Sequence, residues 1–436
     1  MNPEDMIMIS VDDHVVEPPD MFEQHLTPEW KTRAPKVTQL AGGADVWEFE
    51  GRKLPNIGLN AVVGRVPEQY GVEPTSYDQM RPGCWNVHER IRDMNANGML
   101  ASMCFPSFPS FCGQLWNTTE DKQLARVMSQ AYNDWHIDEW CGAYPGRFIP
   151  LAIPPIWDPQ LMADEVRRTA KKGCHAVSFT DNPTKIGMPS FHDPHWDPFW
   201  KACSDEGTVV CIHIGSSAGM VFTSLDSPVD VMITVSPISI VSCAADLLWS
   251  PVLRKYPKLK IALSEGGIGW VPYFLERADY VYEHHSQWTH QDFGSKKPSD
   301  VFREHMLTCF IDDPVGIKLR DEIGVDIINW ECDYPHSDTT WPTAPERLAS
   351  SLAGVSKADI DAMTHLNAMR DYSFDPFAHR KREECTVAGL RAESPDVDMT
   401  LISAGGTPPS EDQARPVTSL DITQQLAHAF EAPSGA

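Results

Sequence analysis

Short apolar runs alternate with helical stretches along most of this chain, and this alternation constrains the fold more than any other feature. The runs have the length and composition of buried strands. We predict strands at Met6–Val11, Met99–Phe105, Phe148–Ile153, Cys174–Phe179, Val209–Ile214, Leu259–Leu263, Met306–Ile311 and Asp326–Trp330. Strands that alternate with helices indicate repeated βα units and a parallel sheet.

The segments between these runs carry apolar residues near helical spacing. We predict helices at Asn86–Asn97, Lys122–Cys141, Asp158–Lys172, Trp196–Glu206, Ile238–Leu253, Trp270–Glu283, Pro345–Leu352 and Lys357–Thr364. Gly98 and Gly173 follow two of them directly, as glycine C-caps do. Eight strands alternating with helices predict an α/β fold of the (β/α)8 TIM-barrel type. A doubly wound open sheet is the alternative, but the turn after the first strand lacks a glycine-rich phosphate-binding motif.

Two regions depart from the alternation. We assign residues 1–384 to the barrel, with a long insertion at about residues 17–81 that is rich in Pro and Gly and includes a small hairpin at Val46–Leu54. Residues 385–436 form a C-terminal tail or arm with a short amphipathic segment at Asp421–Glu431. Weak order and packing against another subunit are both open for this tail.

Composition narrows the range of partners. The net charge of −25 over 436 residues argues against nucleic acids and anionic membranes, because both would repel the chain. We see neither a secretory signal nor an apolar stretch long enough to span a membrane. The 11 cysteines include no C-x-x-C pair, which favours reduced thiols and a cytoplasmic protein. We expect a small-molecule substrate and a homo-oligomer, namely a dimer.

Ligand-type side chains stand where the predicted strands end. Asp12 and His14 follow the first strand two residues apart, so in extended chain both point to the same side. His213 ends the fifth strand, and Asp333 follows the eighth. The carboxyl ends of barrel strands meet at one face, which would bring these side chains together. Buried charges of this kind require pairing or coordination, so the conjunction predicts a metal ion.

Four motifs resemble those of a known family. VDDHVVEPPDMF, CIHIGSS, LSEGGIGWVPYFLERAD and NWECDYPHSDTTWP are similar to the amidohydrolase superfamily, in the amidohydrolase-related branch that includes aminocarboxymuconate-semialdehyde decarboxylase-like enzymes. The resemblance covers about residues 6 to 380. It implies that Asp12, His14, His213 and Asp333 bind a metal, and that Asp333 also handles the proton of an attacking water.

The sixth strand departs from the pattern of that branch. Its members often carry H-G-G there, whereas this chain has Ser264-Glu265-Gly266-Gly267, so Glu265 stands where a catalytic histidine is expected. We add Glu265 to the metal ligands and, with Asp333 and His336, to the catalytic candidates. The oxygen-rich set suits Fe or Mn as well as Zn, and two ions are the alternative to one. His336 and Asp181 are the candidates for additional ligands.

The site supports more than one reaction. Our first interpretation is a hydrolase in which a metal-activated water cleaves an amide, ester or thioester of a medium-sized organic acid derivative. The alternative is a non-oxidative decarboxylase of an aromatic or enoic acid, and a metal-free pseudoenzyme scaffold is a third possibility. The candidates for substrate contact are Arg81, Trp85, Trp330 and Trp341.

Overall fold

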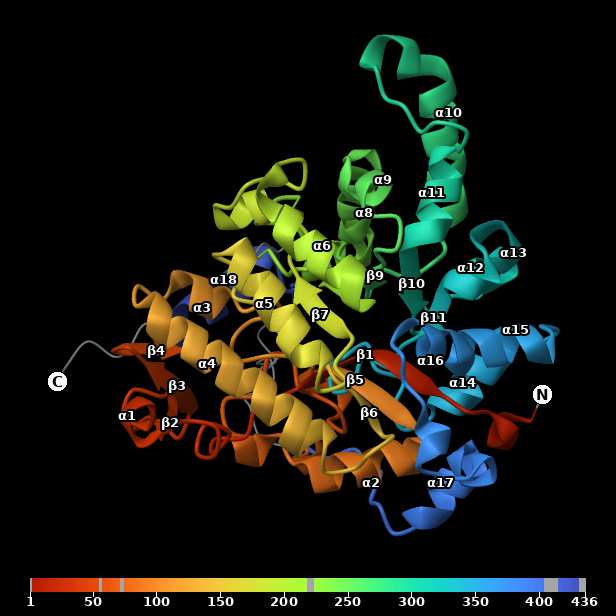
Figure 1. The fold of residues 1–436 in the computed structure, drawn as a ribbon. Helices are drawn as coiled ribbons and strands as arrows, with labels where there is room; N and C mark the ends of the chain where they lie inside the picture. Colours follow the sequence, from red (N-terminus) through yellow and green to blue (C-terminus); the bar gives the residue numbers. More distant parts are fainter. Residues whose placement is uncertain (1, 55–56, 71–73, 218–222, 404–414, 431–436) are drawn as a thin grey trace.

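Parallel strands form the centre of the molecule. The computed structural model describes residues 2–54, 57–70, 74–217, 223–403 and 415–430. Within this part of the chain, the parallel strands are β1 (Ile9–Val15), β5 (Ala101–Pro106), β6 (Phe148–Ile149), β7 (Ala176–Phe179), β8 (Val209–His213), β9 (Ile261–Ser264), β10 (Met306–Phe310) and β11 (Ile328–Trp330) (Figure 1). They pair in chain order within two sheets, β1-β5-β6 and β7-β8-β9-β10-β11. Each predicted strand is present, with ends shifted by a few residues.

Two sets of contacts join these sheets. An isolated parallel bridge between Ala152 and Val177 links the segment after β6 to β7. On the other side, the segment after β11 bonds to β1: the Asp333 amide donates to the Asp12 carbonyl (2.9 Å), and the His14 amide donates to the Tyr334 carbonyl (2.7 Å). The first and last parallel strands therefore lie side by side.

Successive side chains of a strand point to opposite faces, and the buried residues accordingly form two hydrophobic clusters. Met103, Cys211 and Cys309 belong to a cluster that lies between the strands, whereas neighbouring positions pack toward the helices. The β1–β5 register shifts between Ser10 and Asp13. Such a bulge changes which residues face inward, and His14 thereby pairs with Phe105, a residue of the inner cluster.

The helices predicted between the strands are present, and one of them is divided into two. They are α2 (Val87–Asn97), α4 (Lys122–Trp135), α5 (Pro159–Ala170), α6 (Asp197–Glu206), α8 (Ile240–Trp249), α9 (Val252–Lys255), α10 (Val271–Thr289), α14 (Ala344–Ser351) and α15 (Lys357–Asp361). The single helix expected at Ile238–Leu253 is divided into α8 and α9, because Ser250 precedes a proline and is extended at ψ 164°.

The remaining α-helices of the described residues are spread along the chain. They are α1 (Pro28–Lys31), α3 (Gln114–Thr118), α7 (Val229–Val235), α11 (Pro298–His305), α12 (Pro314–Lys318), α13 (Arg320–Ile323), α16 (Asn367–Asp371), α17 (Val387–Glu393) and α18 (Ser419–Phe430). Helices α10 and α11 project from the body of the molecule (Figure 1).

The segment between β1 and α2 contains a separate antiparallel sheet. Its strands are β2 (Lys36–Gln39), β3 (Asp45–Phe49) and β4 (Arg52–Leu54), in the order β2-β3-β4. The predicted hairpin corresponds to β3 and β4. Sequence reasoning missed β2, which has only one strongly apolar residue, Val37.

The C-terminal segment returns across the molecule. The Ile402 amide donates to the Gly64 carbonyl (2.9 Å), and the Val229 amide at α7 donates to the Val417 carbonyl (2.8 Å). Helix α18 covers the predicted amphipathic segment up to Phe430, and Glu431 lies outside the described residues.

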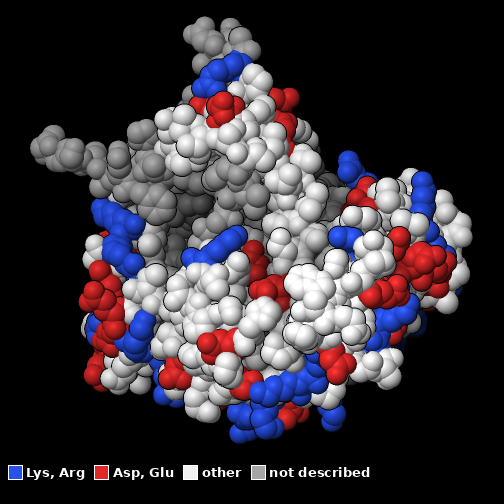
Figure 2. Space-filling view, turned by 90° about the horizontal axis from the view of Figure 1, so that it is seen from above, with Lys and Arg blue, Asp and Glu red and all other residues white. Residues whose placement is uncertain are grey.

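No single described helix is long and apolar enough to cross a membrane; Val229–Val235 and Pro237–Trp249 reach that length only as a pair bent by 43°. On the face that Figure 2 shows, acidic and basic side chains are interspersed among uncharged ones. The net negative charge is thus not gathered into one acidic patch on this face.

Candidate metal centre

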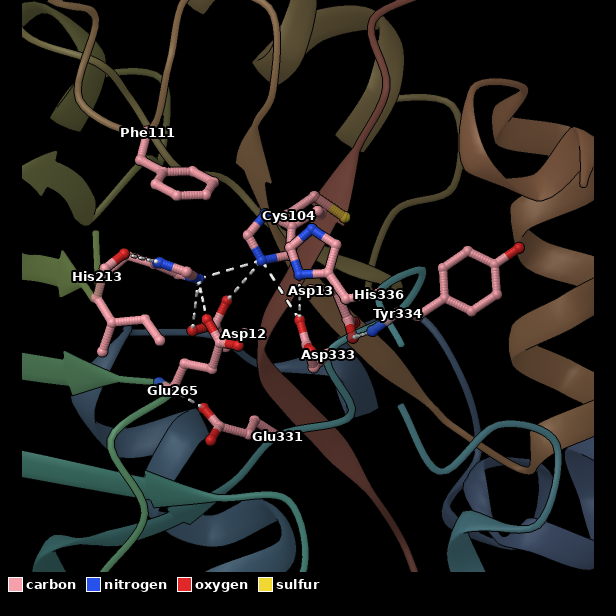
Figure 3. A network of polar contacts seen from close by, with 12 residues as sticks. Asp12, Asp13, Cys104, Phe111, His213, Glu265, Glu331, Asp333, Tyr334 and His336 are labelled. Atoms are coloured by element: carbon pink, nitrogen blue, oxygen red, sulfur yellow. Dashed lines mark hydrogen bonds and ion pairs between the residues drawn. The ribbon is translucent and has the colours of Figure 1, made fainter. Parts of the chain in front are cut away.

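Asp12 and His14 reach the interior because the β1 bulge turns them inward. Both side chains are fully buried. His213 comes from the end of β8, and its Nδ1 lies 2.6 Å from the Ile214 carbonyl oxygen. That contact places the His213 proton on Nδ1 and leaves Nε2 as a lone-pair donor. The two histidine Nε2 atoms, of His14 and His213, are 3.1 Å apart (Figure 3).

Carboxylates surround this histidine pair. The Asp12 oxygens lie 3.7 Å from each histidine Nε2. Glu265 Oε2 lies 3.0 Å from His213 Nε2, and Asp333 Oδ1 lies 3.4 Å from His14 Nε2. His336 adds its Nδ1 at 2.9 Å from Asp333 Oδ1. The structure therefore brings together all the ligands predicted from the sequence, together with His336.

Glu265 and Asp333 share an unusual backbone conformation. Both have φ of 58°, in the left-handed region that side chains other than glycine seldom adopt. Each follows the end of a strand, β9 and β11 respectively. This turn of the backbone directs both carboxylates toward the histidines, and such conformations concentrate at functional sites.

The residues present fit a divalent cation. Neither Asp12 oxygen has a hydrogen-bond partner among the described residues, although both are buried. Two nitrogens at about 2.1 Å from one ion lie roughly 3.0–3.4 Å apart, which matches the His14–His213 separation. Ligand atoms compatible with a metal form two overlapping groups, Asp12-His14-His213 and His14-Glu265-Asp333-His336. Asp181 lies outside both groups; its amide donates to the Ser216 hydroxyl oxygen at 2.8 Å.

The electrostatics of the cluster suit a bound cation. Burial raises the pKa of Asp12 and of Asp333 well above the usual range, and the Glu265 carboxylate adds to both shifts. Burial lowers the pKa of His14, as do the neighbouring histidines. Burial also acts to lower the pKa of His213, but Glu265 outweighs it and the net shift is upward. A cation bound beside Asp12 would favour the ionised Asp12 carboxylate and the neutral histidines.

Sequence reasoning missed two groups that hold the ligands in place. The Asp13 carboxylate accepts hydrogen bonds from the Tyr334 amide (2.9 Å) and the Ser102 hydroxyl. Arg90, fully buried, donates to the carbonyl oxygen of His14 at 2.5 Å. The Asp13–Tyr334 bond ties the end of β1 to the segment that carries Asp333, and the Arg90 bond ties it to α2. Asp13 lies between two predicted ligands in the sequence. Its side chain points away from the ligand cluster because of the β1 bulge, and no sequence pattern indicated that bulge.

Glu331 is the third omission. It is 1% exposed, and its Oε2 accepts a hydrogen bond from the Glu265 amide at 3.2 Å. Burial raises its pKa to about 8, and the charge of Glu265 contributes. The strand alternation offered a signal, because Glu331 and Asp333 are two residues apart and so share a side in extended chain.

The same alternation corrects the assignment of Trp330. We predicted a substrate contact, but its indole is 1% exposed and belongs to the core beneath the helices. Trp330 is adjacent to Glu331 in an extended segment and therefore points to the opposite side. Its role is packing.

The other predicted substrate contacts have structural partners. The Arg81 guanidinium donates two hydrogen bonds to Asp93, at 2.8 and 2.7 Å, and lies over the Trp341 ring at 4.4 Å. Trp341 itself donates to the Asp93 carbonyl at 3.0 Å. Trp85 packs edge-on against Tyr77. A substrate contact by Arg81, Trp85 or Trp341 stays a prediction from the sequence.

An α/β fold that gathers histidines and carboxylates at the ends of parallel strands defines a class of metal-dependent enzymes. A family model described as amidohydrolase matches residues 22–374. The chain belongs to this family, as its motifs indicated.

Solved structures share the fold. An amidohydrolase from Mycobacterium avium subsp. paratuberculosis K-10 is 21% identical, with a TM-score of 0.64 over 85% of this chain and 98% of its own. A 5-carboxyvanillate decarboxylase from Novosphingobium aromaticivorans DSM 12444, complexed with manganese and 4-hydroxy-3-methoxy-5-nitrobenzoic acid, is 18% identical, with a TM-score of 0.58 over 84% and 96%. A 2,6-dihydroxybenzoate decarboxylase from Rhizobium is 17% identical, with a TM-score of 0.54 over 84% and 99%.

Proposed function

We propose that this protein is a metal-dependent decarboxylase that releases CO2 without oxidation from an aromatic acid, and that its parallel strands close into a (β/α)8 barrel. One observation carries the proposal: the buried Asp333 carboxylate contacts both His14 (3.4 Å) and His336 (2.9 Å) through its Oδ1. The decarboxylases among the similar structures support this reaction better than hydrolysis of an amide, ester or thioester, which we ranked first from the sequence. The contacts between β1 and the segment after β11 support closure of the barrel.

Asp12, His14, His213, Glu265 and Asp333 would hold one divalent ion. The two possible ligand groups share His14, which favours a single ion over the binuclear alternative. The carboxylate-rich set suits manganese, which the similar carboxyvanillate decarboxylase binds, as well as zinc or iron. When bound, the ion would polarise the carboxylate or a phenolate oxygen of the substrate.

Asp333 supplies the proton in this account. Neither of its buried oxygens has a hydrogen-bond partner among the described residues; Oδ1 lies near His14 and His336, which leaves Oδ2 to carry a proton. The protonated carboxyl group transfers this proton to the ring carbon that bears the carboxylate. The bond to the carboxylate then breaks, its electron pair restores the aromatic ring, and CO2 leaves. Water returns a proton to Asp333, while His336 orients the carboxyl group.

A substrate screen tests the proposal. The protein, first stripped with a chelator and then loaded with manganese or zinc, is incubated with hydroxybenzoates labelled with 13C in the carboxyl group. We expect labelled CO2 from at least one acid, only after metal loading. If the loaded protein cleaves aryl esters or anilides and releases no CO2 from any of the acids, hydrolysis is the reaction.

A further inference from the structure

A cavity of about 430 Å³ lies between the inserted antiparallel sheet and the loop after β5. Apolar side chains make up most of its wall: Trp47, Leu54, Ile57, Phe108, Phe111 and Leu115. An apolar cavity of about 150 Å³ accepts a benzene molecule. The available space therefore exceeds what a single-ring acid fills.

One wall residue connects this cavity to the metal centre. The Phe111 ring lies 4.3 Å from the ring of His213 and 5.3 Å from that of His14, between centroids. Figure 3 shows Phe111 on one side of the cluster and Glu331 on the other. Gly215, two residues beyond His213, also lines the cavity. One end of a ligand in the cavity would thus lie against Phe111 and Gly215, beside the ring of His213.

The aromatic wall is held in position before any ligand binds. Trp47 from β3 stacks on Phe108, with centroids 4.3 Å apart. The buried Glu17 carboxylate accepts hydrogen bonds from the amides of Ser107 (3.0 Å) and Phe108 (2.7 Å). The Phe111 carbonyl accepts one from the Ser178 hydroxyl at 2.5 Å. A wall fixed in this way loses little conformational entropy on binding.

The described wall of the cavity carries positive charge and no negative charge. Arg52, on β4, is the only charged residue among the described residues of the wall. It forms no ion pair with the described part of the chain, and its one hydrogen bond, to the Thr118 hydroxyl, is 3.5 Å long. A guanidinium without a carboxylate partner beside an aromatic wall suits a ligand carboxylate.

We infer that the substrate is an extended aromatic dicarboxylic acid of about two rings. One carboxyl group reacts at the metal centre, the rings lie along Phe111 and Phe108, and the second carboxylate pairs with Arg52. This inference rests on the proposed function, because it places the reacting carboxyl group at the metal.

Calorimetric titration of the metal-loaded protein tests the inference with two probes, biphenyl-4,4′-dicarboxylate and biphenyl-4-carboxylate. We expect wild type to bind the dicarboxylate about fivefold more tightly than the monocarboxylate. Arg52→Gln should remove that preference and leave monocarboxylate binding unchanged. Lys53→Gln is the matched control: it removes the same charge one residue along β4, where the side chain points to the opposite side, so it should retain the preference.

A dicarboxylate preference that survives Arg52→Gln, or no binding of either biphenyl acid at millimolar concentration, would overturn the inference. Equal melting temperatures of wild type and both variants show that the substitutions leave the fold intact. The binding preference requires no turnover, so it holds or fails independently of decarboxylation. Conversely, CO2 release from single-ring acids at a rate unaffected by Arg52→Gln would leave the proposed function in place and reject the extended substrate.

Discussion

The Nε2 atoms of His14 and His213 face one another at 3.1 Å across 199 positions of sequence. Because His213 Nδ1 contacts a backbone carbonyl, its Nε2 carries a lone pair directed at His14. A buried pair of imidazoles with convergent nitrogens, bordered by Asp12, has the arrangement of ligands around one cation. The proposed metal site is built around this histidine pair.

Asp12→Asn tests the metal centre. The substitution keeps the side-chain shape but removes a negative charge from the ligand set, so we expect metal affinity to fall at least tenfold, by analogy with losses at ligand-supporting residues. Metal content after dialysis against graded chelator measures it. His192→Gln is the control, because this exposed histidine pairs with Asp246 on the surface. Equal metal retention in Asp12→Asn and wild type would remove Asp12 from the ligands.

Asp333→Asn tests the proton donor. An amide cannot transfer a proton as a carboxylic acid does, so we expect kcat for CO2 release to fall roughly 10³-fold. Single-turnover kinetics, corrected for bound metal, separate this loss from weaker metal binding. Wild-type rates in a fully metal-loaded variant would rule out Asp333 as the donor.

Glu331 offers a test of positioning. Its carboxylate accepts from the Glu265 amide, and Glu265 has a left-handed backbone. Glu331→Gln keeps an acceptor oxygen, whereas Glu331→Leu leaves the amide without one, so the Leu variant should lose more metal affinity than the Gln variant. We expect Leu to weaken binding roughly tenfold and Gln by less. Identical losses of metal affinity in both variants would show that the charge of Glu331, and not its hydrogen bond with the Glu265 amide, supports metal binding.

The sequence could predict that Asp12, His14, His213, Glu265 and Asp333 come together, because each lies in or just after the carboxyl-terminal part of a parallel strand; their binding of a metal stays a prediction. The predicted side-chain direction was wrong where the strand alternation was not applied. Glu331 and Trp330 are neighbours, and Glu331, which faces the ligands, is not among the residues predicted from the sequence. The β1 bulge also had no sequence signal, since Asp12 and Asp13 are both acidic.

The cavity wall could not be predicted from the sequence. Trp47 and Phe108 stack although they come from separate segments of the chain. Their contact depends on how the insertion folds back on the loop after β5, and no local periodicity encodes that packing. For the same reason, the sequence makes Arg81 a candidate for substrate contact, because its pairing with Asp93 depends on how the chain folds.

Glu17 predicts a pH dependence of stability. Burial raises its pKa from 4.5 to about 7, although the amides of Phe108 and Ser107 oppose this. The folded protein therefore binds the proton more tightly than the unfolded chain, and stability is lost as pH rises from 4.5 through 7. The loss is at most about 3 to 4 kcal/mol, at 1.36 kcal/mol per pKa unit.

Urea unfolding at a series of pH values measures this effect. The free energy of unfolding of wild type relative to Glu17→Gln should fall across that pH range. Glu23→Gln, at an exposed glutamate, is the control and should show no such trend. A difference between wild type and Glu17→Gln that is constant with pH would contradict the raised pKa.

Gly98 and Gly207 form a matched pair for stability. Both end helices in the left-handed conformation, at φ of 73° and 63°. A Cβ at Gly98 would lie 2.6 Å from Val387 Cγ1, whereas one at Gly207 would have no atom within 4 Å. Gly207→Ala should cost about 1 kcal/mol from backbone strain alone, and Gly98→Ala about 2–3 kcal/mol, because α17 must also shift. Equal shifts in melting temperature would exclude the contact with α17.

The fate of the substrate's carboxyl carbon distinguishes decarboxylation from hydrolysis. An acid that the metal-loaded protein consumes is supplied in D2O with 13C in its carboxyl group, and both products are followed by NMR and mass spectrometry. The account predicts one 13CO2 per molecule consumed and one deuterium at the carbon that lost it, with both absent after chelation. Retention of the label in a free carboxylic acid, with a bond cleaved elsewhere by water, would contradict it.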